Sequence, residues 1–116
     1  MDIDAAAPGQ ARRTVRETLA KLGVSEELAA DILVVTSELV SNAVEHGDGF
    51  EGMELEHEGD QFTVRVYDHS TVRPKPRAVE PLTPRSRGLM LVDALAPAWG
   101  SEECEGGKFV WARFTV

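Results

Sequence analysis

Apolar residues recur at helical spacing near the start of the chain, among charged ones. Val15, Leu19 and Leu22 fall three or four positions apart within residues 9–22, and Gly23 follows as a stop signal. This spacing predicts a helix over residues 9–22. We expect the preceding residues 1–8 to form a disordered tail.

The longest periodic segment covers residues 26–46 and predicts the most regular helix of the chain. Ser25 precedes it as an N-cap, two glutamates open it, and Gly47 closes it. At about 100° per residue, one broad side of the helix is apolar and the other is polar. The apolar side holds Leu28, Ile32, Leu33, Val35, Leu39, Val40, Ala43 and Val44. The polar side holds Asp31, Glu38, Ser41, Asn42 and Glu45.

The second half of the chain changes to the alternation that is typical of strands. Residues 50–58 and 61–68 alternate apolar and polar positions around Gly59 and Asp60, which predicts a β-hairpin. Two further strands, at 98–103 and 108–116, flank a turn at residues 105–107, and a short apolar helix is predicted over 88–95. Four prolines between residues 70 and 86 mark a long loop, at Pro74, Pro76, Pro81 and Pro84.

The order of these elements predicts one domain over residues 1–116. It runs helix, helix, strand, strand, loop, helix, strand, strand. We therefore expect an α+β fold, a two-layer α/β sandwich. Its sheet should be mixed but mostly antiparallel, with the helices on one face.

Charge and composition narrow the classes of function. A net charge of −8 argues against a direct nucleic-acid partner, which is bound mainly through Lys and Arg. The loop region is nevertheless basic, which fits a small anion, and its basic residues are Arg73, Lys75, Arg77, Arg85 and Arg87. No segment has the apolar length of a membrane span, and acids stand where a secretory signal needs bases. Cys104 is the single cysteine, which fits a cytoplasmic protein, and we expect its thiol to be buried.

Three polar positions are candidates for chemistry. Glu38 and Asn42 are four residues apart on one helix face, so their oxygens can share a hydrated Mg²⁺. The alternative, a stripe that only faces solvent, is commoner. Asp68 ends a predicted strand, where its carboxylate can accept a hydrogen bond from an exocyclic amine of a ligand. The alternative is an ordinary aspartate at a turn.

Two glycine motifs are weaker candidates. Arg87 and Gly88 open the short helix directly after the basic loop, and helix N-termini bind phosphate well. Glycine also begins many helices that bind no ligand. Gly106 and Gly107 are by default only a hairpin turn.

Together, the order and spacing of these motifs resemble the GHKL superfamily, the ATPases and kinases of the Bergerat fold. The segment 38–47 is similar to the N-box, above all that of the anti-sigma-factor serine kinases. Asp68 and Ser70, with Pro74, resemble the first glycine box, residues 87–92 the second, and residues 106–111 the last. The resemblance extends from about residue 12 to residue 116.

The resemblance implies a Bergerat ATP-binding fold and a role for each matching residue. Asn42 would complete the Mg²⁺ shell, and Glu38 would be the catalytic base. Asp68 would bind the adenine amine, and residues 69–86 would form the ATP lid. The remaining residues of the implied nucleotide site are His46, Ser70, Arg87, Gly88 and Leu89.

The implied function is that of an ATP-dependent protein serine/threonine kinase acting as an anti-sigma factor. In that branch the kinase phosphorylates a serine on a STAS-type antagonist protein and sequesters a sigma factor, which controls transcription. The sequence leaves the oligomeric state open, and homodimers are usual in this branch.

Two other interpretations remain beside it. Ser86 replaces a glycine of the second box, and Phe109 lies about where a threonine often assists adenine binding. These departures favour a non-catalytic interaction module of the same fold with weak nucleotide binding. The third interpretation, the catalytic half of a histidine kinase, lacks a dimerisation helix bearing a phospho-accepting histidine.

Overall fold

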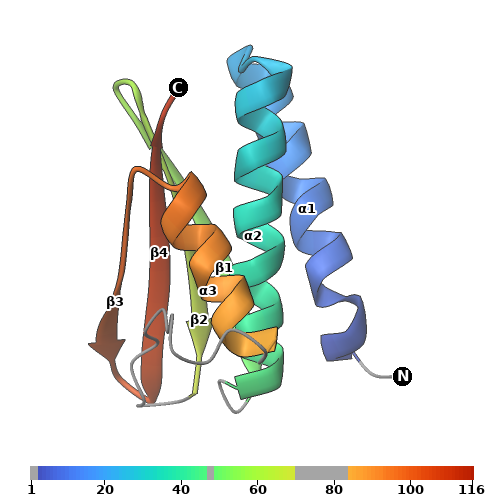
Figure 1. Cartoon of the computed structure of the whole chain (residues 1–116), viewed down its shortest axis with the longest axis vertical. Helices are drawn as coiled ribbons and strands as arrows, with labels where there is room; N and C mark the ends of the chain where they lie inside the picture. Colours follow the sequence, from blue (N-terminus) through green and yellow to red (C-terminus); the bar gives the residue numbers. More distant parts are fainter. Residues whose placement is uncertain (1–2, 47–48, 70–83) are drawn as a thin grey trace.

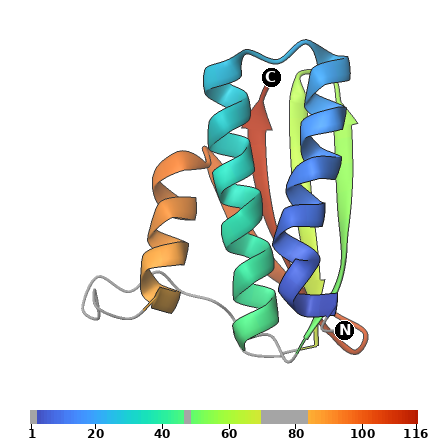
Figure 2. The ribbon, with the colours of Figure 1, turned by 90° about the vertical axis from the view of Figure 1, so that its right-hand side faces the viewer.

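The computed structural model describes residues 3–46, 49–69 and 84–116, which form a layer of helices against a sheet (Figure 1). The elements are α1 (Ile3–Leu22), α2 (Glu26–His46), β1 (Phe50–Glu58), β2 (Gln61–Asp68), α3 (Pro84–Leu95), β3 (Ala98–Cys104) and β4 (Gly107–Thr115). All three helices lie on the same face of the sheet (Figures 1 and 2). The predicted α+β two-layer sandwich is therefore confirmed.

The sheet consists of two hairpins joined through their second strands. Its order is β1-β2-β4-β3, and every pair among the described strands is antiparallel. Gly59 and Gly106 occupy the two turns at positive φ, 61° and 84°, which glycine adopts without a steric penalty. The central pair, β2 with β4, joins residues that lie far apart in the sequence.

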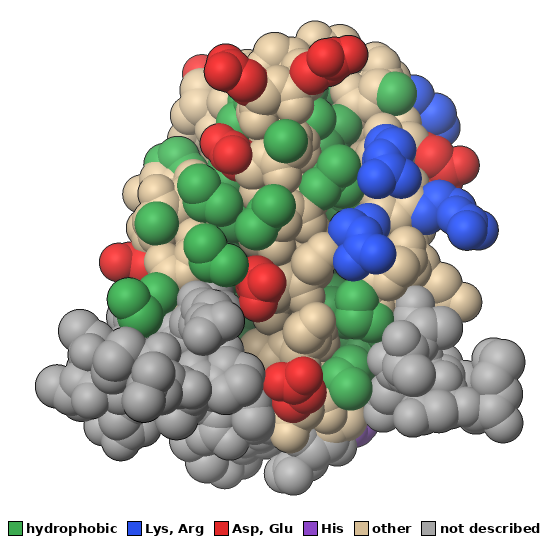
Figure 3. Space-filling model, turned by 45° about the vertical axis from the view of Figure 1, so that its right-hand side comes forward, with side chains coloured by type: hydrophobic (Ala, Val, Ile, Leu, Met, Phe, Trp, Pro, Cys, Tyr) green, Lys and Arg blue, Asp and Glu red, His purple; other side chains and the backbone are tan. Residues whose placement is uncertain are grey.

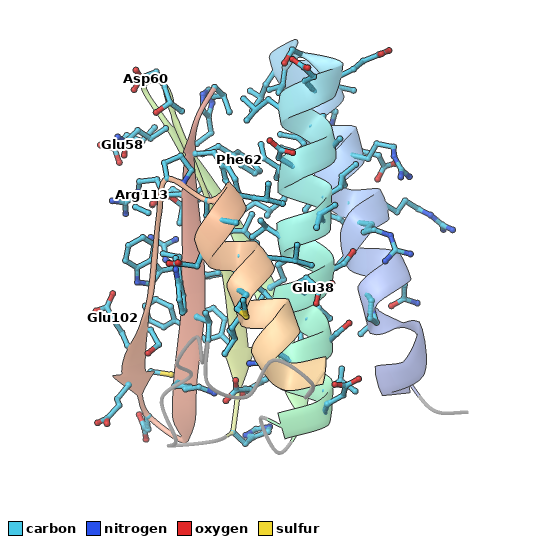
Figure 4. All side chains as sticks on the ribbon, in the orientation of Figure 1. Glu38, Glu58, Asp60, Phe62, Glu102 and Arg113 are labelled. Carbon is cyan, nitrogen blue, oxygen red and sulfur yellow. The ribbon has the colours of Figure 1, made fainter. Side chains whose placement is uncertain are left out.

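The core lies between the sheet and the helices because alternate strand residues point to the helical side. Phe62, Val64 and Val66 of β2 are fully buried, as are the matching residues of β4. Figure 4 shows Phe62 pointing toward the helices, whereas Arg113 and Glu102 point to the opposite side of the sheet. Each large apolar side chain buried in this way stabilises the fold by about 1.5–3 kcal/mol.

Helix α2 forms as the sequence predicts. The backbone N–H of Leu28 donates to Ser25 Oγ at 3.2 Å, which confirms the N-cap. The apolar side of the helix is buried through Ile32, Val35 and Leu39, while Glu38 and Asn42 lie at its half-buried margin. The helix therefore has a core side and a solvent side, as its periodicity predicts.

Three local expectations are wrong. α1 begins at Ile3, so residues 3–8 are helical and not a disordered tail, and Ala7 and Ala11 pack into the core. α3 begins at Pro84, where proline suits the first helical position, and not at residue 88. Cys104 is exposed, because it ends the edge strand β3 beside a tight turn.

Candidate functional site

The segments that carry the predicted site residues meet at one end of the molecule. α2 and β2 both finish there, and α3 and β4 both begin there (Figures 1 and 2). The antiparallel arrangement thus brings together four segments that are separate in the sequence, 38–46, 68–69, 84–89 and 107–108.

Glu38 and Asn42 lie one helical turn apart on α2, and both side chains are half-buried. Partial burial raises the pKa of the Glu38 carboxyl above its ordinary value, and the negative charge of Glu45 raises this pKa further. A carboxylate with a raised pKa binds a proton more readily, which suits a general base. Their carboxylate and amide oxygens are also ligand types that Mg²⁺ accepts.

Asp68 lies at the end of β2 and is almost completely removed from solvent, with 1% of its surface exposed. Lys108 Nζ donates a hydrogen bond of 2.6 Å to Asp68 Oδ2 and is 3% exposed. The two residues are direct cross-strand partners of β2 and β4. The carboxylate expected to bind adenine is thus part of a buried ion pair.

The sequence does not point to Lys108, the residue that pairs with Asp68 at this end of the molecule.

The side chain of Phe109, which the sequence places near the nucleotide, lies on the outer face of the sheet. There its ring centroid is 5.2 Å from that of Tyr67, and the Arg65 guanidinium lies over it at 6.0 Å. The alternation of buried Val110 and Ala112 indicates that position 108 faces inward, which is the signal that could have found it.

The structure places the other predicted residues only in part. His46 belongs to α2, and Arg87 and Gly88 belong to α3, but their side chains lie outside the described part of the chain. Ser70 and most of the expected lid, residues 70–83, also lie outside the described residues. Leu89 is buried on α3, beside the apolar core.

Other candidate sites are less developed. A pocket on the outer face of the sheet is lined by Glu56, Glu58, Gln61, Thr63 and Arg113. It lies at the hairpin end of β1 and β2, opposite the end where β2 finishes. Within residues 3–46, 49–69 and 84–116, no three His, Cys, Asp or Glu side chains are grouped to hold a metal ion. In the same ranges, no helix combines the length and apolarity needed to cross a membrane.

A family model, the histidine kinase-like ATPase domain, matches residues 2–114. The chain belongs to this family. No curated protein matches the sequence. Membership of the histidine kinase-like ATPase domain family supports the resemblance to the GHKL superfamily and implies ATP binding. The anti-sigma-factor branch stays a prediction.

The residues at the site end of this ATPase domain fit an ATP–Mg²⁺ ligand. Glu38 and Asn42 carry oxygen atoms of the kind that Mg²⁺ binds, and both side chains lie at the half-buried margin of α2. Asp68 provides a hydrogen-bond acceptor at the end of β2, and Lys108 provides the only buried ammonium among the described residues. These side chains are of the chemical types that bind a nucleotide base and a hydrated Mg²⁺.

Proposed function

We propose that this ATPase domain is an ATP- and Mg²⁺-dependent protein serine/threonine kinase that acts as a cytoplasmic anti-sigma factor. Its substrate would be a serine on a STAS-type antagonist, and its second partner a sigma factor. One observation carries the proposal: Glu38, whose pKa is raised, lies one turn from Asn42 in a chain that matches the ATPase family over residues 2–114.

Each residue has a separate task in the proposed transfer. ATP, when bound, supplies the phosphoryl group, and Mg²⁺ offsets its negative charge. The Asn42 amide oxygen would hold the cation, and the Asp68 carboxylate would accept a hydrogen bond from the adenine amine. Glu38 would accept the proton that the serine hydroxyl loses as its oxygen bonds to the γ-phosphorus, while the bond from that phosphorus to the bridging oxygen breaks and ADP leaves. The raised pKa of Glu38 strengthens the carboxylate for that proton transfer.

The surface beside Glu38 supports a protein as the phosphoryl acceptor. Val34 lies one turn before Glu38 on α2 and is 40% exposed, and Met90 and Leu91 of the neighbouring α3 are 41% and 38% exposed. Figure 3 shows hydrophobic side chains gathered on the helical side of the molecule. Such exposed apolar groups are typical of protein interaction sites.

The test compares two variants of α2. Asn42→Ala should abolish the Mg²⁺-dependent thermal shift that ATP produces. Glu38→Ala should leave this shift largely intact and reduce transfer to a STAS-type antagonist by at least about 100-fold. Glu27→Ala, an exposed glutamate in the first turn of the same helix, is the matched control and should change neither. Equal loss of binding and transfer in Glu38→Ala would show that Glu38 is not the base.

A second candidate is a non-catalytic interaction module of the same fold. The position of Phe109 favours it, because its ring packs against Tyr67 on the outer face of the sheet and not on the side that carries Asp68. Under this alternative, ATP and Mg²⁺ produce no thermal shift in the unmodified protein. Partner binding would then be insensitive to Asn42→Ala.

A further inference from the structure

Lys108 is a buried charge for which neither the fold nor the proposed transfer accounts. Its ammonium and the Asp68 carboxylate are 3% and 1% exposed, and the contact between them is 2.6 Å long. Apolar residues of similar volume would fill such a position without the desolvation penalty of two ions. A buried ion pair at the end of β2 and β4, where the four site segments meet, therefore calls for a functional explanation.

We propose that Lys108 is a positioning residue that fixes the Asp68 carboxylate as the acceptor for the 6-amino group of adenine. This inference rests on the proposed nucleotide binding. An ammonium has three donors and no acceptor, so Lys108 can only hold the carboxylate as an acceptor. Its bond to Oδ2 also restricts rotation of the Asp68 side chain.

A ligand can use Asp68 without displacing Lys108. The two oxygens of a carboxylate offer about four lone-pair positions, so one carboxylate can accept hydrogen bonds from Lys108 and from other donors at the same time. A 6-amino group can therefore add its N–H to the same carboxylate. The ion pair stays intact, so binding leaves no uncompensated charge in the interior.

This arrangement selects between purines at position 6. Adenine presents an N–H donor there, whereas hypoxanthine presents a carbonyl oxygen, which a fixed carboxylate repels. Hydrogen bonds to charged groups are among the stronger ones in proteins. We therefore expect the unmodified protein to prefer Mg²⁺–ATP over Mg²⁺–ITP by at least about tenfold.

The experiment measures the dissociation constants of Mg²⁺–ATP and Mg²⁺–ITP by calorimetry for the full chain and its variants. In Lys108→Met, which keeps an unbranched side chain without the charge, the ATP preference should fall to about threefold or less. Lys108→Arg should keep most of the preference. Lys21→Met, the same exchange at an exposed position of α1, is the matched control and should keep all of it.

A ratio of two affinities separates positioning from a structural role. If Lys108 only stabilised the fold, its removal would weaken both nucleotides together and leave the preference unchanged. That result would overturn the inference. A wild-type protein that binds neither nucleotide would instead overturn the proposed nucleotide binding.

A charge-swapped variant covers the case in which Lys108→Met fails to fold. Asp68→Lys with Lys108→Asp keeps one buried ion pair but moves the acceptor from β2 to β4. The swap should melt at a higher temperature than either single exchange, and it should not restore the preference for ATP. Restoration of that preference by the swap would contradict the positioning role, because any ion pair at this place would then suffice.

Discussion

The Glu38 carboxyl is subject to two effects that both disfavour its ionised form. Its partial burial disfavours the ionised form, and Glu45, two turns further along α2, adds a like charge. Both effects raise the pKa of Glu38, so this carboxyl stays protonated at pH values where an exposed glutamate is ionised. Because its environment destabilises the ionised form, the Glu38 carboxylate is a stronger base than an exposed glutamate.

The pH dependence of transfer should report this environment. The proposed base acts only when ionised, so transfer is lost as the pH falls through the pKa of Glu38. Glu45→Gln removes the second cause of the raised pKa. The acidic limb of the profile of kcat against pH should consequently move to lower pH.

The control for this prediction is Glu27→Gln, which removes one negative charge from the far end of α2. It should leave the acidic limb in place, because the charge lies about three turns from Glu38 and is largely screened. A limb that Glu45→Gln leaves in place, or moves to higher pH, would contradict the assignment of Glu38 as the titrating base.

At the scale of the elements, the start of β4 beside the end of β2 leaves no room for a larger side chain. Gly107 begins β4, and a Cβ atom there would overlap the backbone carbonyl oxygen of Asp68. Backbone cannot yield as a flexible side chain can, so the two strands would have to separate. Gly107 is thus required for the approach that places Lys108 beside Asp68.

We predict that Gly107→Ala lowers the free energy of unfolding by at least about 2 kcal/mol. Gly52→Ala is the control, because a Cβ at Gly52 of β1 meets no atom within 4 Å. It should change stability by less than about 1 kcal/mol. Urea unfolding of both variants, followed by circular dichroism, measures the difference. Equal stability of the two variants would show that the strands can adjust at this junction.

The periodicity of the sequence predicts the elements well because each pattern is local. The bounds of α2, β1 and β2 follow from the N-cap at Ser25 and from alternation around Gly59. The start of α1 was missed because Ala7 and Ala11 carry little hydrophobic signal, although both are buried against the core. Small residues become visible as core only when their packing partners are known.

The candidate site likewise has a part that depends on local sequence and a part that depends on non-local packing. The relation of Glu38 to Asn42 is a property of one helix, so the sequence can predict it. The contact between Asp68 and Lys108 depends on β2 pairing with β4. In the sequence, the hairpin neighbour of Lys108 is Glu103, and that local pairing gives no hint of Asp68. The missed residue thus belongs to the non-local part of the sheet.

At the scale of the whole molecule, acidic side chains lie on both layers. The exposed outer face of the sheet carries glutamates, at Glu54, Glu56, Glu58 and Glu102, and Arg65 forms an ion pair with Glu56 at 2.9 Å. In the helical layer, α1 carries four basic residues, Arg12, Arg13, Arg16 and Lys21. Figure 3 shows Lys and Arg side chains gathered along one side of the helical face, and Figure 4 shows Glu58 and Glu102 on the sheet side.

This excess of acids should make the stability of the protein depend on salt. With a net charge of −8, like charges repel one another, and this repulsion is stronger in the compact folded state than in the unfolded chain. Salt screens the repulsion, with a Debye length of about 10 Å at 0.1 M. Exposed ion pairs lose little in salt because they contribute little at any ionic strength. Raising NaCl from about 10 to 200 mM should therefore stabilise the fold by about 1 kcal/mol, or about 4 °C in Tm.

The double variant Glu58→Lys with Glu102→Lys tests the cause. Each exchange removes one negative charge and adds one positive charge, which brings the net charge from −8 to −4. Both side chains are exposed on the sheet side, so packing should not change. The variant should melt at a higher temperature than the unmodified protein in low salt and respond less to added NaCl. An equal salt response in both proteins would mean that excluded-surface effects of the salt, and not charge repulsion, set the trend.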